Sequence, residues 1–92
     1  MKIFQSKAFE KKVKRISKSD KSALDKAIYA VIKNPEIGTE KKGDLVKIFV
    51  YKYKIKNQQY LLAYRFTGVD LELVKIDVHQ IFYRDLKKQI KH

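Results

Sequence analysis

The second half of this chain contains three runs in which apolar and polar residues alternate, and these runs constrain the fold more than any other feature. In Ile48 to Ile55, aromatic side chains fall on one set of alternate positions, and Lys52 and Lys54 fall on the other. Tyr60 to Phe66 and Leu71 to His79 repeat the alternation. Because successive side chains of a strand point to opposite faces, each run predicts a half-buried strand.

The apolar positions of these strands are expected to share one face of a sheet. That face comprises Phe49, Tyr51, Tyr53, Tyr60, Leu62, Tyr64, Val74, Ile76 and Val78. The opposite face comprises Lys52, Lys54, Arg65, Lys75, Asp77 and His79, and Tyr83 follows the last strand. A slip of one residue in register would exchange the two sets. Cationic and titratable side chains gathered on one face predict a site for an anion, with acid/base capacity.

The first half of the chain carries two amphipathic helical patterns. Apolar residues recur at spacings of three and four over Phe9 to Ile16 and again over Leu24 to Ile32. Ser6 precedes the first pattern and is a suitable N-cap. Asn34-Pro35 ends the second, because the residue before a proline avoids the helical region. Two such helices joined by a short polar break predict a helical hairpin across the apolar face of the sheet.

The remaining segments complete the expected order of elements. Lys2 to Gln5 is expected to add an edge strand, Glu36 to Gly43 to be a connecting loop, and Phe82 to Ile90 to form a closing helix. Asn57-Gln58 and Thr67 to Asp70 are expected to be hairpin turns. Together these elements predict an α+β two-layer sandwich of order β-α-α-β-β-β-α. In it a helical hairpin covers one face of an antiparallel sheet, and residues 1–92 form a single domain.

The charge of the chain limits its partners. The sequence has 22 Lys and Arg against 10 Asp and Glu, a formal net charge of +12. Such a field speeds encounters with nucleic acid or with an acidic protein, and it does not by itself distinguish between them. A surface that is simply rich in lysine is the alternative interpretation.

Several classes of protein are disfavoured by what the sequence lacks. Without cysteine there are no disulfides and no cysteine zinc sites, which suits a reducing cytoplasm. No run approaches the roughly 20 apolar residues of a membrane span. The histidines are His79 and His92 alone, and neither a glycine-rich phosphate loop nor a Ser/His/Asp grouping is recognisable. We therefore expect a cytoplasmic protein with no membrane association, no metal and no cofactor.

RNA cleavage suits these residues, because RNA carries its own nucleophile in the 2′-hydroxyl. A protein needs only to orient that group, stabilise the phosphorane and move two protons. His79 could move a proton near neutral pH, Lys52, Lys54 and Arg65 could hold the phosphate, and Tyr83 could stack on a base or share proton transfer. The alternative is structural: a strand-end histidine, solvated lysines on an exposed strand and a tyrosine packed between helix and sheet.

Sequence segments along essentially the whole chain resemble the RelE/ParE superfamily of bacterial toxins from toxin–antitoxin pairs. They are SKAFEKKVKRI, a second helix ending at NP, the GDL of Gly43 to Leu45, YKYKIKNQQYLLAYRF and DVHQIFYRDLKK. Tyr51 to Ile55 is similar to the lysine-bearing strand of RelE-type ribosome-dependent mRNA endonucleases. His79 and Tyr83 are similar to the histidine and aromatic residue near the C-terminus of YafQ-type members.

This resemblance implies an mRNA interferase that inhibits translation at the ribosome and is held inactive by a cognate acidic antitoxin. The implied catalytic residues are Lys52, Lys54, His79 and Tyr83. The implied RNA-binding residues are Lys52, Lys54, Arg65, Lys75 and Arg84.

Two residues depart from the pattern. Leu61 stands where many endonucleases of the superfamily carry an arginine, and Phe49 stands where close relatives often carry a basic residue. Arg65 lies on the same predicted face as Leu61, further along the strand. ParE-type members share the fold and poison DNA gyrase without the RNA-cleaving residues. A gyrase-directed toxin and a non-catalytic basic nucleic-acid-binding module are therefore the alternative functions.

Overall fold

A single sheet of five strands, in the spatial order β1-β5-β4-β3-β2, organises the computed structural model, which describes residues 1–41 and 47–78. The elements are β1 (Lys2–Gln5), α1 (Lys7–Arg15), α2 (Lys18–Lys33), β2 (Thr39–Glu40), β3 (Ile48–Ile55), β4 (Gln58–Phe66) and β5 (Asp70–Val78). The expected antiparallel meander is formed by β3, β4 and β5, and β1 pairs parallel to β5, so the sheet is mixed. The α+β class and the order of these elements agree with the prediction. The predicted closing helix, Phe82 to Ile90, lies outside the described residues.

Two connecting segments differ from the expected ones. The segment expected to be a loop, Glu36 to Gly43, contains the two-residue strand β2, which pairs with β3. A strand this short leaves no alternation to detect in the sequence. The first hairpin turn lies at Lys56-Asn57, one residue earlier than predicted, because Ile55 pairs with Gln58.

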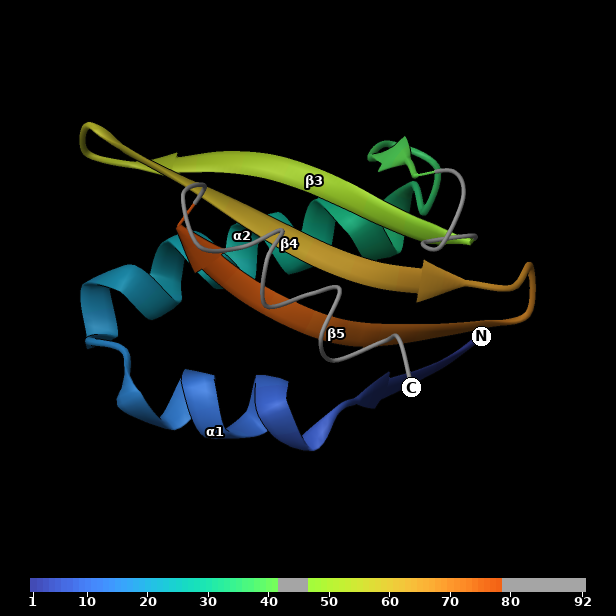
Figure 1. Cartoon of the computed structure of the whole chain (residues 1–92), viewed down its shortest axis with the longest axis horizontal. Helices are drawn as coiled ribbons and strands as arrows, with labels where there is room; N and C mark the ends of the chain where they lie inside the picture. Colours follow the sequence, from blue (N-terminus) through green and yellow to red (C-terminus); the bar gives the residue numbers. More distant parts are fainter. Residues whose placement is uncertain (42–46, 79–92) are drawn as a thin grey trace.

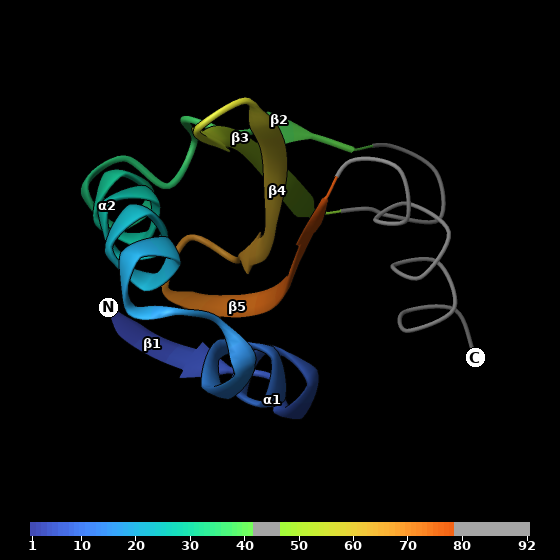
Figure 2. The same cartoon turned by 90° about the vertical axis from the view of Figure 1, so that its left-hand side faces the viewer.

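The two helices take different positions on the sheet. Figures 1 and 2 show α2 across one face, whereas α1 follows β1 and runs alongside β5. Ser6 caps α1 as expected, since its Oγ accepts the Phe9 N–H at 3.0 Å. Ser17 caps α2 by accepting the Asp20 N–H at 3.2 Å. The chain therefore changes direction between the helices at Ile16 and Ser17, where the backbone is extended.

The packing between α2 and the sheet is the larger of two hydrophobic clusters. Its buried members are Phe9, Leu24, Ala27, Val31, Leu62, Tyr64, Leu71, Leu73 and Ile76. Phe49, Tyr51 and Tyr53 pack against it from β3. The predicted orientation of this aromatic set toward the helices is therefore confirmed.

A β-bulge at Val74 makes one predicted orientation wrong. Ala63 pairs with Lys75 but Tyr64 pairs with Leu73, so β5 has one extra residue between these pairs. An extra residue reverses the alternation on one side of it. Val74, predicted to lie beneath the helices, therefore belongs to the cluster on the opposite face, and Leu73 takes a place in the helix-side core.

Tyr64 fastens the segment after α2 to the centre of the sheet. Its ring is fully buried and stacks on Phe49 with centroids 5.4 Å apart. Its hydroxyl donates to the Pro35 carbonyl at 2.7 Å and accepts the Gly38 N–H at 3.0 Å. Burial raises the pKa of this hydroxyl, which therefore stays protonated and able to donate at neutral pH. A Cβ at Gly38 would lie 2.8 Å from the Tyr64 Oη and 2.9 Å from the Val50 carbonyl oxygen, so the close approach requires glycine.

Replacing Tyr64 with phenylalanine should lower the free energy of unfolding by about 1–3 kcal/mol, because the Gly38 N–H and the Pro35 carbonyl lose a buried partner. Urea denaturation would measure the change. The matched control is Tyr29→Phe, whose side chain is exposed on α2 and which should change stability by less than about 0.5 kcal/mol. Equal stability of the two variants would contradict the anchoring role of the Tyr64 hydroxyl.

Candidate functional site

The face of the sheet opposite α2, which we call the lysine face, collects the charged side chains of the meander. Directly paired residues of adjacent strands share a face. Lys52 pairs with Leu61, which pairs with Asp77, and Lys75 pairs with Ala63 in the next row. The lysine face consists of Ile48, Val50, Lys52, Lys54, Gln59, Leu61, Ala63, Arg65, Glu72, Val74, Lys75 and Asp77.

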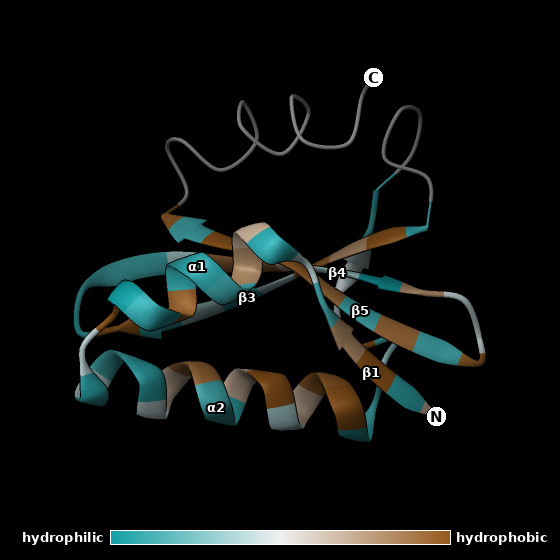
Figure 3. Cartoon of the chain, turned by 90° about the horizontal axis from the view of Figure 1, so that it is seen from below, coloured by the Kyte–Doolittle hydropathy of each residue, from teal (hydrophilic) through white to brown (hydrophobic). Residues whose placement is uncertain are grey.

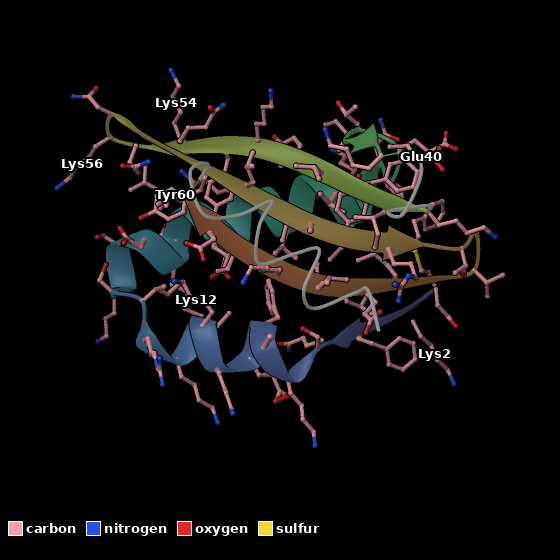
Figure 4. All side chains as sticks on the ribbon, viewed as in Figure 1. Lys2, Lys12, Glu40, Lys54, Lys56 and Tyr60 are labelled. Atoms are coloured by element: carbon pink, nitrogen blue, oxygen red, sulfur yellow. The ribbon has the colours of Figure 1, made fainter. Side chains whose placement is uncertain are left out.

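Lys52 and Lys54 are the most accessible cations of this face. Both are exposed, and their backbones are about 7 Å apart because they are two positions apart along the strand. Figure 4 shows Lys54 pointing away from the sheet near the β3–β4 hairpin. The ion pairs within residues 1–41 and 47–78 involve neither lysine. Both side chains are therefore open to solvent on this face.

Asp77 is a buried carboxylate that joins β5 to α1. Its side chain accepts the Val78 N–H at 2.8 Å, and the residue is only 7% exposed. Lys12 Nζ lies 3.7 Å from one carboxylate oxygen and Lys75 Nζ lies 4.0 Å from the other. These groups border a hollow of about 260 Å³ that Lys11 and Arg15 also line. Lys75 is therefore held on the lysine face by Asp77, beside further positive charge from α1.

Arg65 lies on the lysine face as predicted, but away from Lys52 and Lys54. It pairs with Ile48, two rows along the sheet from Lys52, and its Nη1 lies 3.0 Å from Glu72 Oε1. Leu61, in the row of Lys52, is fully buried. Within the described part of the chain, no arginine therefore stands beside the two lysines.

The sequence did not reveal two features of this face. Its centre is an apolar floor of Ile48, Val50, Leu61, Ala63 and Val74, all buried. The sequence does contain a signal for these buried residues. Residues 48–51 and 61–64 are two unbroken apolar runs, and such runs are typical of strands buried on both faces. The contact of Lys12 with Asp77 joins residues far apart in sequence, and no spacing rule identifies it.

Tyr53 lies at the margin of the helix side, with its ring stacked on Tyr60 at 5.7 Å. Burial, reinforced by Tyr60 and Asp20, raises the pKa of the Tyr53 hydroxyl. This phenol therefore stays protonated near neutral pH and is unsuited to act as a base. The predicted residues His79, Tyr83 and Arg84 lie outside the described residues.

No group of three His, Cys, Asp or Glu side chains able to hold a metal occurs among residues 1–41 and 47–78. Neither α1 nor α2 is long and apolar enough to cross a membrane.

Comparison with known proteins identifies one family. Residues 3–87 match the family described as ParE-like toxin of type II bacterial toxin–antitoxin system. The isolated RelE toxin of Escherichia coli superposes with a TM-score of 0.66 at 15% identity, over 95% of this chain and 96% of that one. A chain of the intact Escherichia coli RelBE toxin–antitoxin complex gives a TM-score of 0.66 at 17% identity, over 82% of this chain and 92% of that one. At these identities the likeness establishes a shared fold, and no curated protein matches the chain.

Replacing Asp77 with alanine should lower the free energy of unfolding by about 1–3 kcal/mol, because the Val78 N–H and Lys75 lose a buried acceptor. The comparison variant is Lys12→Ala, which removes the more exposed end of the same network and should cost under about 1 kcal/mol. Urea denaturation of both variants measures the difference. A loss for Asp77→Ala no greater than that for Lys12→Ala would show that the carboxylate does not hold the network.

Proposed function

Since the chain belongs to the ParE-like toxins of type II bacterial toxin–antitoxin systems, we propose that it is a toxin that cleaves messenger RNA at the ribosome and so inhibits translation. One observation carries this proposal. Lys52 and Lys54 lie exposed at neighbouring positions of the lysine face, with Lys75 and Asp77 on the same face. Accessible cations on one face can stabilise the negative charge that develops on a phosphate group during its cleavage.

The proposed reaction uses the 2′-hydroxyl of the RNA as nucleophile. The 2′-oxygen attacks the adjacent phosphorus and loses its proton to a base, while the bond from phosphorus to the 5′-oxygen breaks. An acid protonates the departing 5′-oxygen, which leaves a 2′,3′-cyclic phosphate and a 5′-hydroxyl. The negative charge that develops on the phosphorane is what positioned cations stabilise.

Each predicted residue takes one part of this chemistry in the proposal. Lys52 and Lys54 stabilise the phosphorane, and His79 transfers a proton, a role for which histidine is a suitable residue type. Tyr83 stacks on a base or shares in proton transfer.

The remaining cations hold the RNA backbone. Lys75 and Arg84 contact phosphates beside the reacting group. Arg65 contributes less, because Glu72 already neutralises it at 3.0 Å. The net charge of +12 draws the toxin toward ribosomal RNA. The cognate antitoxin is proposed to be acidic, so that it can cover this positive surface.

Gyrase inhibition is the second candidate function, and the position of Arg65 favours it. Leu61 is buried where many endonucleases of the superfamily have an arginine, and Arg65 lies two rows away in an ion pair. Among the described residues, the lysine face therefore lacks one cation that a full RNA-cleaving site is expected to have. A gyrase-directed toxin would not need that cation.

Replacing His79 with alanine should slow cleavage of mRNA on a programmed ribosome by roughly 100-fold to 10,000-fold, the usual contribution of a general acid or base. Lys52→Ala and Lys54→Ala should also slow it, by removing charge stabilisation from the transition state. Single-turnover assays measure these rates, with thermal melting to check folding. Lys33→Ala is the matched control, because Lys33 is an exposed lysine at the end of α2.

Undiminished cleavage by a folded His79→Ala protein would overturn the proposed proton transfer. Growth arrest that persists in the His79, Lys52 and Lys54 variants, with DNA damage and intact transcripts, would instead favour gyrase as the target.

A further inference from the structure

A hollow of about 400 Å³ lies where the first half of α2 packs beside β3, and we call it the α2–β3 hollow. Its wall on α2 is built from positions three and four apart, which share one side of a helix. These residues are Ser19, Ser22, Ala23, Lys26 and Ala27. All but the lysine are small, so they leave space between helix and strand. Figure 3 shows that the first turns of α2 are hydrophilic, unlike its later turns, so this wall suits a polar ligand.

The wall on β3 is aromatic. Tyr51 and Tyr53 line it with half-buried side chains, and both also pack against the helix-side core. The ring of Tyr53 stacks on Tyr60, and this contact supports its orientation. Within the described residues, the Tyr53 hydroxyl takes part in none of the hydrogen bonds. The β3 wall therefore presents apolar ring surface together with a hydroxyl that can donate to a ligand.

Two lysines also line the α2–β3 hollow, Lys26 from α2 and Lys54 from β3. Both are exposed, and neither belongs to an ion pair within residues 1–41 and 47–78. Asp20 is near enough to affect the pKa of Tyr53, but it is not among the residues that line the hollow. Cations beside aromatic rings are the combination with which proteins hold single-stranded RNA, because lysines contact phosphates and rings stack on bases.

Lys54 connects the α2–β3 hollow with the lysine face. Its pairing with Gln59 places it on the lysine face, and its side chain also lines the hollow. Strand β2 pairs with Phe49 and Val50, so within the described residues no strand lies beside residues 51–55 on their outer side. An RNA strand bound at the lysine face can therefore pass around this edge of β3 and reach the hollow.

We propose that the α2–β3 hollow holds the base of an RNA nucleotide next to the phosphate bound at Lys52 and Lys54. The base packs against Tyr51 and Tyr53, the Tyr53 hydroxyl donates a hydrogen bond to the edge of the base, and Lys26 contacts the following phosphate. This inference rests on the RNA binding of the proposed function and not on the groups that transfer protons. The hollow thereby becomes a determinant of sequence preference that lies apart from the cleavage chemistry.

NMR of the tyrosine rings tests the bound base directly. The probe is a short single-stranded RNA with 2′-fluoro sugars, which lacks the nucleophile for cleavage, and the comparison ligand is an abasic oligomer of the same length. A stacked base should shift the ring signals of Tyr51 and Tyr53, whereas the abasic oligomer should shift them much less. The exposed ring of Tyr29 on α2 is the control and should not respond.

Two outcomes would overturn the inference. Unshifted Tyr51 and Tyr53 signals at millimolar RNA would show that no base enters the hollow, and equal shifts with the abasic oligomer would show that it binds phosphate alone. Shifts produced by the purified antitoxin and not by RNA would also contradict the inference, because they would assign the hollow to a protein partner.

Variants provide a second measurement with matched controls, read by fluorescence anisotropy. Lys26→Ala should weaken binding of the same RNA about 10-fold, because it removes a charged contact to phosphate. Lys21→Ala removes the same charge from the same helix, but Lys21 lines a different hollow, so its effect should be much smaller. Equal losses in these two variants would show that net charge alone matters and would contradict the assignment.

The Tyr53 hydroxyl is tested by Tyr53→Phe, which keeps the ring. This variant should bind the RNA about 3-fold more weakly and the abasic oligomer unchanged, since only the base accepts the hydrogen bond. Tyr29→Phe is the matched control, and thermal melting checks folding. If Tyr53→Phe melts early, the pair of lysine variants decides.

Cleavage on the programmed ribosome is scored separately. Base-dependent shifts at Tyr51 and Tyr53 without cleavage by the wild type would support this inference and refute the proposed reaction. Cleavage without these shifts would refute this inference alone.

Discussion

The packing of Phe49, Tyr51 and Tyr53 against the helix-side core determines where the lysines of β3 lie. Side chains alternate along a strand, so three aromatic rings on one side leave Lys52 and Lys54 on the other. A one-residue slip would place two ammonium groups beneath α2 and expose three aromatic rings to water. The register of β3 is therefore fixed by burial, and the position of the candidate site follows from it.

The bulge at Val74 shapes the other side of the lysine face. Before the bulge, Leu71 and Leu73 pack toward the helices, and after it Ile76 does so. The reversal places both Val74 and Lys75 on the lysine face, and Asp77 follows in the next row. Because of this extra residue, β5 contributes side chains both to the helix-side core and to the apolar floor. The same strand also carries Lys75 and Asp77, which form a charged network with Lys12 of α1.

The parts of the fold that sequence could predict are those with repeating patterns. Alternation over three runs located the meander and the lysine face, and Ser6 and Asn34-Pro35 located helix ends. The β2 strand was missed because two residues carry no period, and Val74 was misplaced because a bulge leaves no mark in residue type. The ion pairs of Arg65 with Glu72 and of Asp77 with Lys12 depend on tertiary placement, so their effect on the site required the structure. The roles of His79, Tyr83 and Arg84 stay predictions from the sequence.

Salt dependence of RNA binding tests most directly whether the lysine face is the surface that binds phosphate. Association with a single-stranded RNA oligonucleotide would be measured across a salt series for the wild type and for two double variants. Lys52→Ala/Lys54→Ala and Lys21→Ala/Lys33→Ala remove the same formal charge, the first pair from the lysine face and the second from α2. The slope of log affinity against log salt should fall by about 1.4 in the first variant, since each lost phosphate contact on a single strand is worth about 0.7, and by clearly less in the second. Equal slopes for the two variants would contradict the account, because RNA would then respond to net charge alone.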